Sequence, residues 1–363
     1  MKTIQNPLLI LCIGLACSHS FCQNPRPIQD SLVREGSQTV RSGEKVFDFF
    51  SSTGVLEMSL CFDIKELLKS KNQPEYFDAT LTVKKNESDS VTRHIKLKVR
   101  GNMRLSYCSF PPILLKFDKA DCDSEYFQGR KTLKLVTQCY QTSQFEKYLL
   151  KEYLVYQLFN LVTPFSFRTR LVKIHYIDSH PSGNDFTEYG FLIENDDEVA
   201  RRNNAVVMNN ITVTQKHMNT QDMARVAVFN FMIGNTDWAV PNQHNIKVLK
   251  SLDVQSEKGI PVAFDFDYSG FVNTTYSAPA DGLPITTVRE RYYMGICYAQ
   301  DELGPVLEEF SSLQEKFRDV IDNFQFLSGG DKKQIEAYMN TFYKMYKYQD
   351  GPMNDMNRTC QRF

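Results

Sequence analysis

The sequence predicts an α+β fold, in which a sheet-rich first half is followed by a mainly helical second half. Apolar and polar side chains alternate in several segments between residues 56 and 117, and a period of two is typical of strands with one buried face. From about residue 220 onward, apolar side chains recur every three or four residues, which is the spacing of a helix face. Antiparallel strands followed by packed helices leave a cleft at the junction of the two halves, where a ligand can bind.

The pattern of apolar residues locates the individual elements. The alternation predicts strands at residues 56–62, 77–83, 95–99 and 113–117. A polar turn between the second and third strands makes them an antiparallel pair. Shorter strands are predicted at residues 132–138, 169–177 and 189–194. A helix over residues 144–161 is apolar almost all round, so we expect it to be buried between layers.

The composition bounds the class of protein. Hydrophobic residues make up 42% of the 363 positions, which supports a fold with a sizeable core and argues against disorder. The 42 Lys and Arg residues are balanced by 43 Asp and Glu residues. Because binding to a phosphate backbone rests on an excess of Lys and Arg, we expect no nucleic-acid partner.

The first residues predict export. Lys2 precedes an apolar run at residues 8–17, which suits the core of a signal peptide but is shorter than the roughly 20 residues of a membrane-spanning helix. Small residues at the third and first positions before Gln23 favour cleavage there. The sequence therefore predicts a signal peptide at residues 1–22 and a Pro-containing linker at residues 23–45.

Two alternatives to cleavage concern the same segment. Lipidation at Cys17 is less favoured, because Leu15 lies one place too late for the usual lipobox, and an uncleaved anchor is the other alternative. No later segment reaches about 18 uninterrupted apolar residues. We expect an exported protein, either periplasmic, at the cell surface or secreted, with no membrane span in the mature chain.

The cysteines permit disulfides. Six would remain after cleavage, at Cys61, Cys108, Cys122, Cys139, Cys297 and Cys360. An even number in an exported protein is compatible with a disulfide framework, but the sequence leaves the pairing open, and a buried apolar thiol is the alternative for each. No Cys-x-x-Cys spacing occurs and the six His residues are scattered, so a zinc site has little support.

Candidate catalytic residues are concentrated between residues 229 and 270. A buried helix breaks at a Gly-Asn pair and Asp237 follows on a loop, and 28 residues later an apolar strand ends in the acids Asp265 and Asp267. Phosphoryl transfer needs one carboxylate to orient or deprotonate the acceptor, and an amide and a carboxylate to hold Mg²⁺. Asp267 would add a second oxygen ligand. The alternative is that both segments are turns, because Asn, Gly and Asp all favour turns.

Two asparagines compete for the role of the amide ligand. The catalytic-loop pattern of protein kinases places Asn five residues after Asp, which selects Asn242. The position directly before the next strand selects Asn245, which we prefer. His244 is a minor alternative as a general base, since a turn histidine bonded to the backbone is more usual.

The same segments resemble a known family. FNFMIGNTDW, HNIKV and VAFDFD resemble the catalytic and metal-binding segments of the spore coat protein H (CotH) kinase family and, more distantly, those of HipA-type kinases. KLKVRGN followed by PPILLKF resembles the CotH pattern in which an Arg-Gly-Asn turn precedes a strand that bears Lys. EYGFLIEND resembles the strand that leads into the interlobe hinge of that family.

The resemblance implies a two-lobed, atypical protein-kinase-like fold with ATP and Mg²⁺ or Mn²⁺ in the cleft. It also implies that Asp237 is the catalytic carboxylate and that Asn245 and Asp265 lie on the metal. The sheet-rich small lobe, the mainly helical large lobe and a tail would occupy residues 46–195, 196–350 and 351–363. The chain departs from the family in having three more residues between the loop Asp and Asn, and in lacking a G-x-G-x-x-G loop.

Three further residues are candidates for binding the nucleotide. Lys116 could reach its phosphates, with Lys98 as the runner-up, but a solvated strand lysine is an equal alternative. Glu152 lies on an apolar helix stripe, where an unpaired carboxylate is unfavourable, so we expect Lys116 to pair with it. A salt bridge at the rim or exposure to solvent is the alternative, and Glu146 competes for the role. Glu194 would mark the hinge or a loop near the metal, and a solvated acidic turn is its alternative.

Two functions follow from these features. The first is an exported CotH-like atypical kinase that transfers the γ-phosphoryl group of ATP to a protein or small-molecule acceptor. The second is a catalytically silent, kinase-like envelope or surface protein that binds a partner through the same cleft. The presence of Asp237, Asn245 and Asp265 favours the first.

Overall fold

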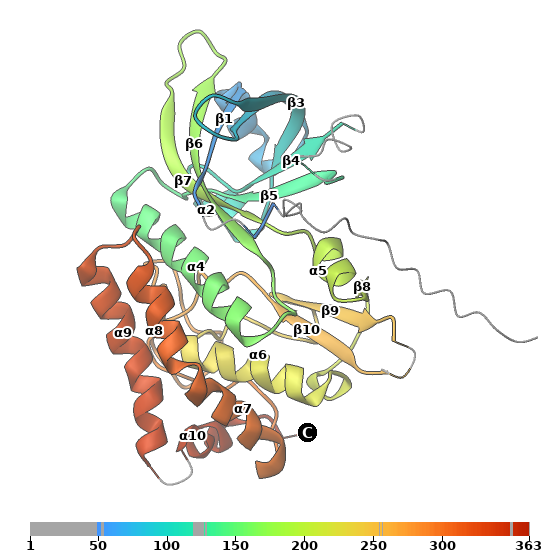
Figure 1. Cartoon of the computed structure of the whole chain (residues 1–363), viewed down its shortest axis with the longest axis vertical. Coiled ribbons are helices and arrows are strands. Elements are labelled where there is room, and N and C mark those ends of the chain that lie inside the picture. Colours follow the sequence, from blue (N-terminus) through green and yellow to red (C-terminus); the bar gives the residue numbers. More distant parts are fainter. Residues whose placement is uncertain are drawn as a thin grey trace, which may run out of the picture. The chain divides into compact units, whose positions relative to one another are not determined.

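Seven strands form a closed barrel in the order β1-β2-β3-β4-β5-β7-β6 (Figure 1). The strands are β1 Leu56–Phe62, β2 Phe77–Lys84, β3 Ser90–Val99, β4 Ile113–Phe117, β5 Thr132–Val136, β6 Thr169–Asp178 and β7 Phe186–Ile193. Neighbouring strands pair antiparallel except β1 and β6, which run parallel with Leu56 opposite Val172. This pairing joins strands more than one hundred residues apart and closes the sheet.

The computed structural model describes residues 49–51, 54–118, 127, 129–253, 255, 257–348 and 351–362. They belong to one compact unit, Phe47–Phe363. The predicted signal peptide, its cleavage site, the linker and Cys122 lie outside the described residues. No helix in the described part of the chain is long and apolar enough to cross a membrane.

The alternating side chains of the strands fill the inside of the barrel. Leu60, Leu97, Leu115 and Ile174 are completely buried and belong to one hydrophobic cluster. Burial of each such side chain contributes about 1.5–3 kcal/mol to the free energy of unfolding, so these positions stabilise the barrel. Lys116 lies between two of the inward residues of β4 and is exposed.

Helix α4, Ser143–Val162, lies between the barrel strands and the C-terminal helices (Figure 1). It contacts β6 and β7 on one side and helix α8 on another. A helix with neighbours on several sides is apolar almost all round, as the sequence predicts for this segment. Glu152 and Tyr156 lie four residues apart, so they project from the same face of α4.

A second, antiparallel sheet lies beside helix α6, Thr220–Ile233 (Figure 1). Its strands are β8 Ala205–Met208, β9 Ile246–Ser251 and β10 Gly259–Ala263, in the order β10-β9-β8. Helix α6 contacts β10 on one side and helices α7 and α9 on the other. The candidate catalytic segments precede β9 and follow β10, so this sheet positions both of them.

The remaining helices in the described part of the chain are α1 Ile64–Lys69, α2 Met103–Tyr107, α5 Asp196–Arg202, α7 Gln300–Ser312, α8 Gln314–Asn323, α9 Gly329–Tyr343 and α10 Gly351–Thr359. The 3₁₀ helices are Ser70–Asn72, Gln215–His217 and Lys344–Lys347. Residues 351–362, suggested by the sequence as part of a tail, contain α10 with Met353 and Met356 buried.

Two disulfides are present among the described residues. Cys108, at the end of α2, is bonded to Cys139 shortly after β5. Cys297 is bonded to Cys360, which joins the segment before α7 to the end of α10. Cys61 is free and partly exposed.

The predicted two-lobed, protein-kinase-like fold is wrong. The strands close into a mixed barrel instead of an open antiparallel sheet, and the half expected to be mainly helical contains a second sheet. The predictions of the barrel strands and of α4 are confirmed, except that β3 begins at Ser90, well before the predicted start at residue 95. Alternation identifies a strand and its buried face, but it carries no information on which distant edge pairs with it. The parallel contact of β1 with β6 could therefore not be read from the pattern.

Candidate functional site

The loop after α6 holds Asp237. Helix α6 ends at Gly234, whose φ of 67° lies in the left-handed region that favours glycine. Nδ2 of Asn235 donates to Oδ1 of Asn230 at 2.9 Å, and Oδ1 of Asn235 accepts from the backbone N–H of Asp237 at 3.0 Å. Asn230 and Asn235 are both buried, so this chain of hydrogen bonds fixes the backbone at Asp237.

Two consecutive side chains hold the carboxylate of Asp237. Nε2 of His244 lies 2.7 Å from Oδ1, and Nδ2 of Asn245 donates to Oδ2 at 2.9 Å. Paired backbone hydrogen bonds of 2.9 Å between Ala239 and His244 close the loop and bring these side chains back to Asp237. Asn242 lies on the exposed part of the loop, and its Oδ1 accepts from the backbone of His244 at 3.2 Å. The geometry therefore places Asn245, and not Asn242, beside Asp237.

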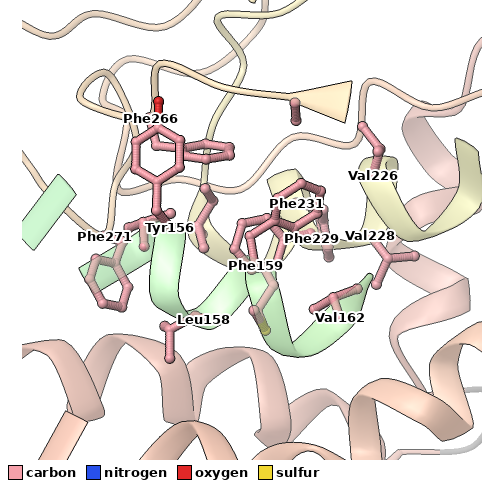
Figure 2. Close-up of a cluster of buried hydrophobic side chains, with 14 of the residues drawn as sticks. Tyr156, Leu158, Phe159, Val162, Val226, Val228, Phe229, Phe231, Phe266 and Phe271 are labelled. Atoms are coloured by element: carbon pink, nitrogen blue, oxygen red, sulfur yellow. The ribbon is translucent and has the colours of Figure 1, made fainter. Parts of the chain in front are cut away.

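The segment after β10 places two acids on either side of a buried phenylalanine. Phe266 is completely buried between Asp265 and Asp267. Its ring centroid lies 4.9 Å from that of Tyr156 and 5.8 Å from those of Phe159 and Phe229 (Figure 2). Phe266 thus anchors the acidic segment to the core between α4 and α6.

The backbone of Asp265 adopts an unusual conformation. Its φ is 61°, which for a residue other than glycine costs about 1–3 kcal/mol. The backbone N–H of Asp265 donates to Oη of Tyr156 at 2.9 Å, and that of Phe264 donates to the carbonyl of Asn245 at 3.1 Å. These bonds hold the left-handed turn and join the acidic segment to the loop that carries Asn245.

Glu152, Asp265 and Asp267 form an acidic cluster. A carboxylate oxygen of each lies within 4.8 Å of the others. Nη2 of Arg104 lies 2.8 Å from Oε2 of Glu152 and 2.8 Å from Oδ2 of Asp267. Tyr276 donates its hydroxyl to the same Oδ2 at 2.9 Å. One oxygen each of Glu152 and Asp267 is therefore engaged by the protein.

The other oxygens of the acidic cluster are available to a ligand. Oε1 of Glu152 is buried and has no hydrogen-bond partner among the described residues. The carboxylate of Asp265 and Oδ1 of Asp267 likewise form no hydrogen bond or ion pair with a described residue. A buried carboxylate oxygen without a partner is unfavourable, and a divalent cation with oxygen ligands would satisfy it.

The surroundings disfavour the charged forms of these acids. Burial raises the pKa of Glu152 to about 8, and Asp267 and Asp265 add to this rise while Arg104 opposes it. Burial, followed by the charge of Asp267, raises the pKa of Asp265 to about 6. Burial and Asp267 also raise the pKa of the Tyr276 hydroxyl. A bound cation would reverse this effect, because it favours the ionised carboxylates.

A basic group lies next to the acidic cluster. Lys134 on β5 and Lys247 on β9 both pair with Asp196 at the start of α5, and Nζ of Lys247 lies 3.3 Å from Oδ2. Arg100, at the end of β3, interacts electrostatically with Asp265 and with Asp196. No hydrogen bond or ion pair with another described residue engages its guanidinium. Burial lowers the pKa of Lys134; the charge of Asp196 and its hydrogen bond oppose this fall, and the charges of Arg100 and Lys247 add smaller contributions in the same direction as burial.

The structure brings together most of the residues that the sequence singles out. Asp237 contacts Asn245, and Asp265 and Asp267 lie with Glu152 in the acidic cluster. Asp237 also contributes electrostatically to the raised pKa of Asp265, which places the loop and the acidic cluster in one site.

Lys116 and Glu194 lie elsewhere. Nζ of Lys116 lies 4.9 Å from the ring centroid of Tyr76, on the exposed face of β4. The partner of Glu152 is Arg104 and not Lys116, whose side chain lies over Tyr76 on the exposed part of β4. Glu194 is buried in an ion pair with Arg202, with Nε to Oε1 at 2.9 Å.

Sequence reasoning missed the basic residues of the site. Arg100 and Arg104 flank a Gly-Asn turn directly after an alternating strand, and this turn was a signal for polar side chains at the sheet edge. Lys134 and Lys247 carry no comparable signal, because single lysines in strands are common on solvated faces. Their common partner Asp196 is apparent only in the folded chain.

No protein-family model and no curated protein sequence matches the chain.

Proposed function

We propose that this chain is an ATP-dependent phosphotransferase that uses Mg²⁺ or Mn²⁺ and has a protein or small-molecule hydroxyl group as its acceptor. The observation that carries the proposal is the adjacency of two oppositely charged groups. The acidic cluster, when its three carboxylates are ionised, has a net charge of minus two after the charge of Arg104 is counted. The basic group has a net charge of plus two, from Arg100, Lys134 and Lys247 together with the negative charge of Asp196. A metal–nucleotide complex presents a cation and a polyphosphate together, which matches this pair of groups.

The donor set of the acidic cluster fits a hard divalent cation. All the available atoms are carboxylate oxygens, which Mg²⁺ and Mn²⁺ prefer, and the buried Oε1 of Glu152 lacks another partner among the described residues. When bound, such a cation neutralises charge on the phosphates and orients them. The ligands we propose are Asp265, Asp267 and Glu152. Asn245, whose amide is engaged by Asp237, orients the catalytic carboxylate.

Asp237 is the proposed proton acceptor. It is partly exposed, so an acceptor hydroxyl can approach it, and its carboxylate is oriented by His244 and Asn245. In the transfer, the proton of the hydroxyl moves to Asp237 and the acceptor oxygen bonds to the γ-phosphorus. The bond from this phosphorus to the bridging oxygen breaks, and the electron pair leaves with ADP.

The basic group would hold the phosphates. The guanidinium of Arg100 forms no hydrogen bond or ion pair with a described residue, so it can donate two parallel hydrogen bonds to two oxygens of one phosphate. Lys134 and Lys247 would attract the phosphates as point charges. The sequence likeness of the Asp237 and Asp265 segments to CotH-family kinases supports the same chemistry.

One observation favours a second candidate, a silent module that binds the nucleotide without transfer. Both oxygens of Asp237 already have side-chain partners, which weakens it as a base. The two candidates share the nucleotide site and differ only in the transfer step.

Thermal unfolding with ATP tests the proposal. ATP with Mg²⁺ or Mn²⁺ should raise the melting temperature, because a ligand at 100 times its dissociation constant stabilises by about 2.7 kcal/mol. Chelation of the metal should remove this shift. ADP production with autophosphorylation or a hydroxyl acceptor then separates the two candidates. No shift at millimolar ATP with either metal would contradict both.

A further inference from the structure

Arg104 joins two parts of the acidic cluster. Its Nη2 lies 2.8 Å from Glu152 of α4 and 2.8 Å from Asp267 of the segment after β10. The side chains of Arg104, Glu152 and Asp267 are only 17%, 2% and 7% exposed. A charge this well shielded from water acts strongly on its neighbours.

Arg104 is held firmly in this position. It belongs to α2, and Cys108 at the end of that helix is bonded to Cys139. Tyr140 donates its hydroxyl to the carbonyl of Tyr107 at 2.5 Å, next to the same disulfide. The guanidinium is therefore a built part of the cluster.

The contacts of Arg104 decide which oxygens are available. Arg104 engages Oε2 of Glu152, and together with Tyr276 it engages Oδ2 of Asp267. The opposite oxygens of these two residues and the carboxylate of Asp265 have no partner among the described residues. Groups that hold the far side of a ligand in this way commonly orient metal sites.

Arg104 also sets the charge of the cluster. With three ionised carboxylates and one guanidinium the sum is minus two, which one divalent cation neutralises. The next charges that face Asp265 are Arg100 and Asp237, which have opposite signs and largely cancel. We infer that Arg104 is a specificity-determining residue that makes this cluster a site for one divalent cation, filled before nucleotide binds. The inference rests on the cation site of the proposed function.

Metal titrations without nucleotide test this inference. Wild-type protein should bind one Mn²⁺, measured by electron paramagnetic resonance, and Tb³⁺ affinity can be measured by its luminescence. Arg104→Gln leaves three negative charges in the cluster, which favours the trivalent ion. The dissociation constant of Mn²⁺ divided by that of Tb³⁺ should therefore rise at least tenfold. Arg104→Lys keeps the charge and should leave the ratio within about threefold of wild type, because a lysine charge at this distance acts similarly. This ratio reports the charge of the cluster, because a loss of packing would weaken the binding of both ions alike.

Two further variants complete the experiment. Arg104→Gln/Glu152→Gln restores a charge of minus two and leaves no buried Glu152 carboxylate without its arginine. This double variant should therefore fold even if Arg104→Gln alone folds poorly, and its ratio of dissociation constants should return toward that of wild type. Arg202→Gln, which removes an arginine from the buried ion pair with Glu194, is the matched control and should leave the ratio unchanged. Circular dichroism checks the fold of each variant.

The outcomes separate this inference from the proposed function. An unchanged ratio in Arg104→Gln, two Mn²⁺ ions per chain, or no binding without nucleotide would overturn it. If Arg104→Gln/Glu152→Gln has the same ratio of dissociation constants as Arg104→Gln, the charge of the cluster does not determine which ion it prefers, and the inference is overturned as well. Mn²⁺ binding with the expected ratios but without any ATP binding would support the inference and contradict the phosphotransferase.

Discussion

Gly270 donates its backbone N–H to the carbonyl of Gly234 at 3.0 Å. This hydrogen bond joins the end of α6, three residues before Asp237, to the segment that follows Asp267. Tyr338 of α9 packs against both glycines, since a Cβ atom would lie 2.0 Å from its Oη at Gly234 and 2.4 Å at Gly270. The spacing between the loop that carries Asp237 and the acidic cluster is therefore set where two glycine backbones are in contact.

Gly270→Ala should lower the free energy of unfolding by about 1–3 kcal/mol, because the new methyl group would overlap the carbonyl of Val288 and Oη of Tyr338. Urea denaturation measures this change. Gly304→Ala is the matched control, since nothing lies within 4 Å of its added Cβ and alanine favours a helix by about 0.5–1 kcal/mol. Equal stability of the two variants would show that the contact of the two backbones tolerates a side chain.

Asp237→Asn should reduce phosphoryl transfer by about 10²–10⁴-fold while leaving ATP affinity nearly unchanged, because the amide removes the proton acceptor with little change of volume. Asp265→Asn should weaken metal and nucleotide binding together, since its carboxylate lies in the acidic cluster. Initial rates of ADP production and calorimetric titration measure the two effects. Asn242→Ala, on the exposed part of the loop, is the control. Equal loss of rate and affinity in both Asp variants would contradict this division of roles.

Arg100→Gln should weaken ATP binding by about 10- to 100-fold, the usual worth of a charge-assisted hydrogen bond to phosphate. Lys116→Gln should leave it unchanged, because Lys116 lies over Tyr76 on the exposed face of the barrel. Titration of each variant with ATP and Mn²⁺ gives both dissociation constants. If only the Lys116 variant bound ATP more weakly, Lys116 and not Arg100 would be the residue that binds the phosphates.

Glu188 should make stability depend on pH. Burial, together with Glu146, raises its pKa to about 7 from an ordinary 4.5, and neither carboxylate oxygen has a hydrogen-bond partner among the described residues. A raised folded-state pKa means that the stabilising proton is fully present below pH 4.5 and lost as the pH rises through about 7.

Glu188→Gln should therefore be more stable than wild type at pH 8, by about 2 kcal/mol after allowance for solvent screening, and nearly equal to it at pH 4. Denaturant midpoints across this range measure the difference. Glu308→Gln, exposed on α7, should follow the wild-type profile. A gain that is constant with pH would contradict burial of a charge at this position.

The parts of the fold that the sequence predicted are those determined by local pattern. The alternation in β1 to β4 reports a buried face directly, and the all-round apolar surface of α4 reports its central position. Closure of the barrel depends on the parallel pairing of Leu56 with Val172, and no local pattern encodes such a pairing.

The candidate site divides in the same way. Asp237, Asn245, Asp265 and Asp267 lie in two segments whose order and turns suggested a common role. The error at Lys116 concerns which strand carries the lysine of the site: Lys134 on β5 points outward toward Asp196, whereas Lys116 on β4 lies over Tyr76 and is exposed, and the alternation of β4 and β5 does not distinguish the two positions. The role of Arg104 depends on three segments meeting in space, so the sequence could not indicate it.

The parallel seam between β1 and β6 also governs the order in which the protein can assemble. During synthesis, β1 emerges more than one hundred residues before its partner, so its apolar face cannot be enclosed until β6 has left the ribosome. Folds dominated by such distant contacts acquire their native state slowly, because a long loop must close before the contact is made. We expect refolding to be limited by formation of this seam. A circular permutant that begins at β6 and links the original termini would place the two strands further apart along the chain, and we expect it to refold more slowly.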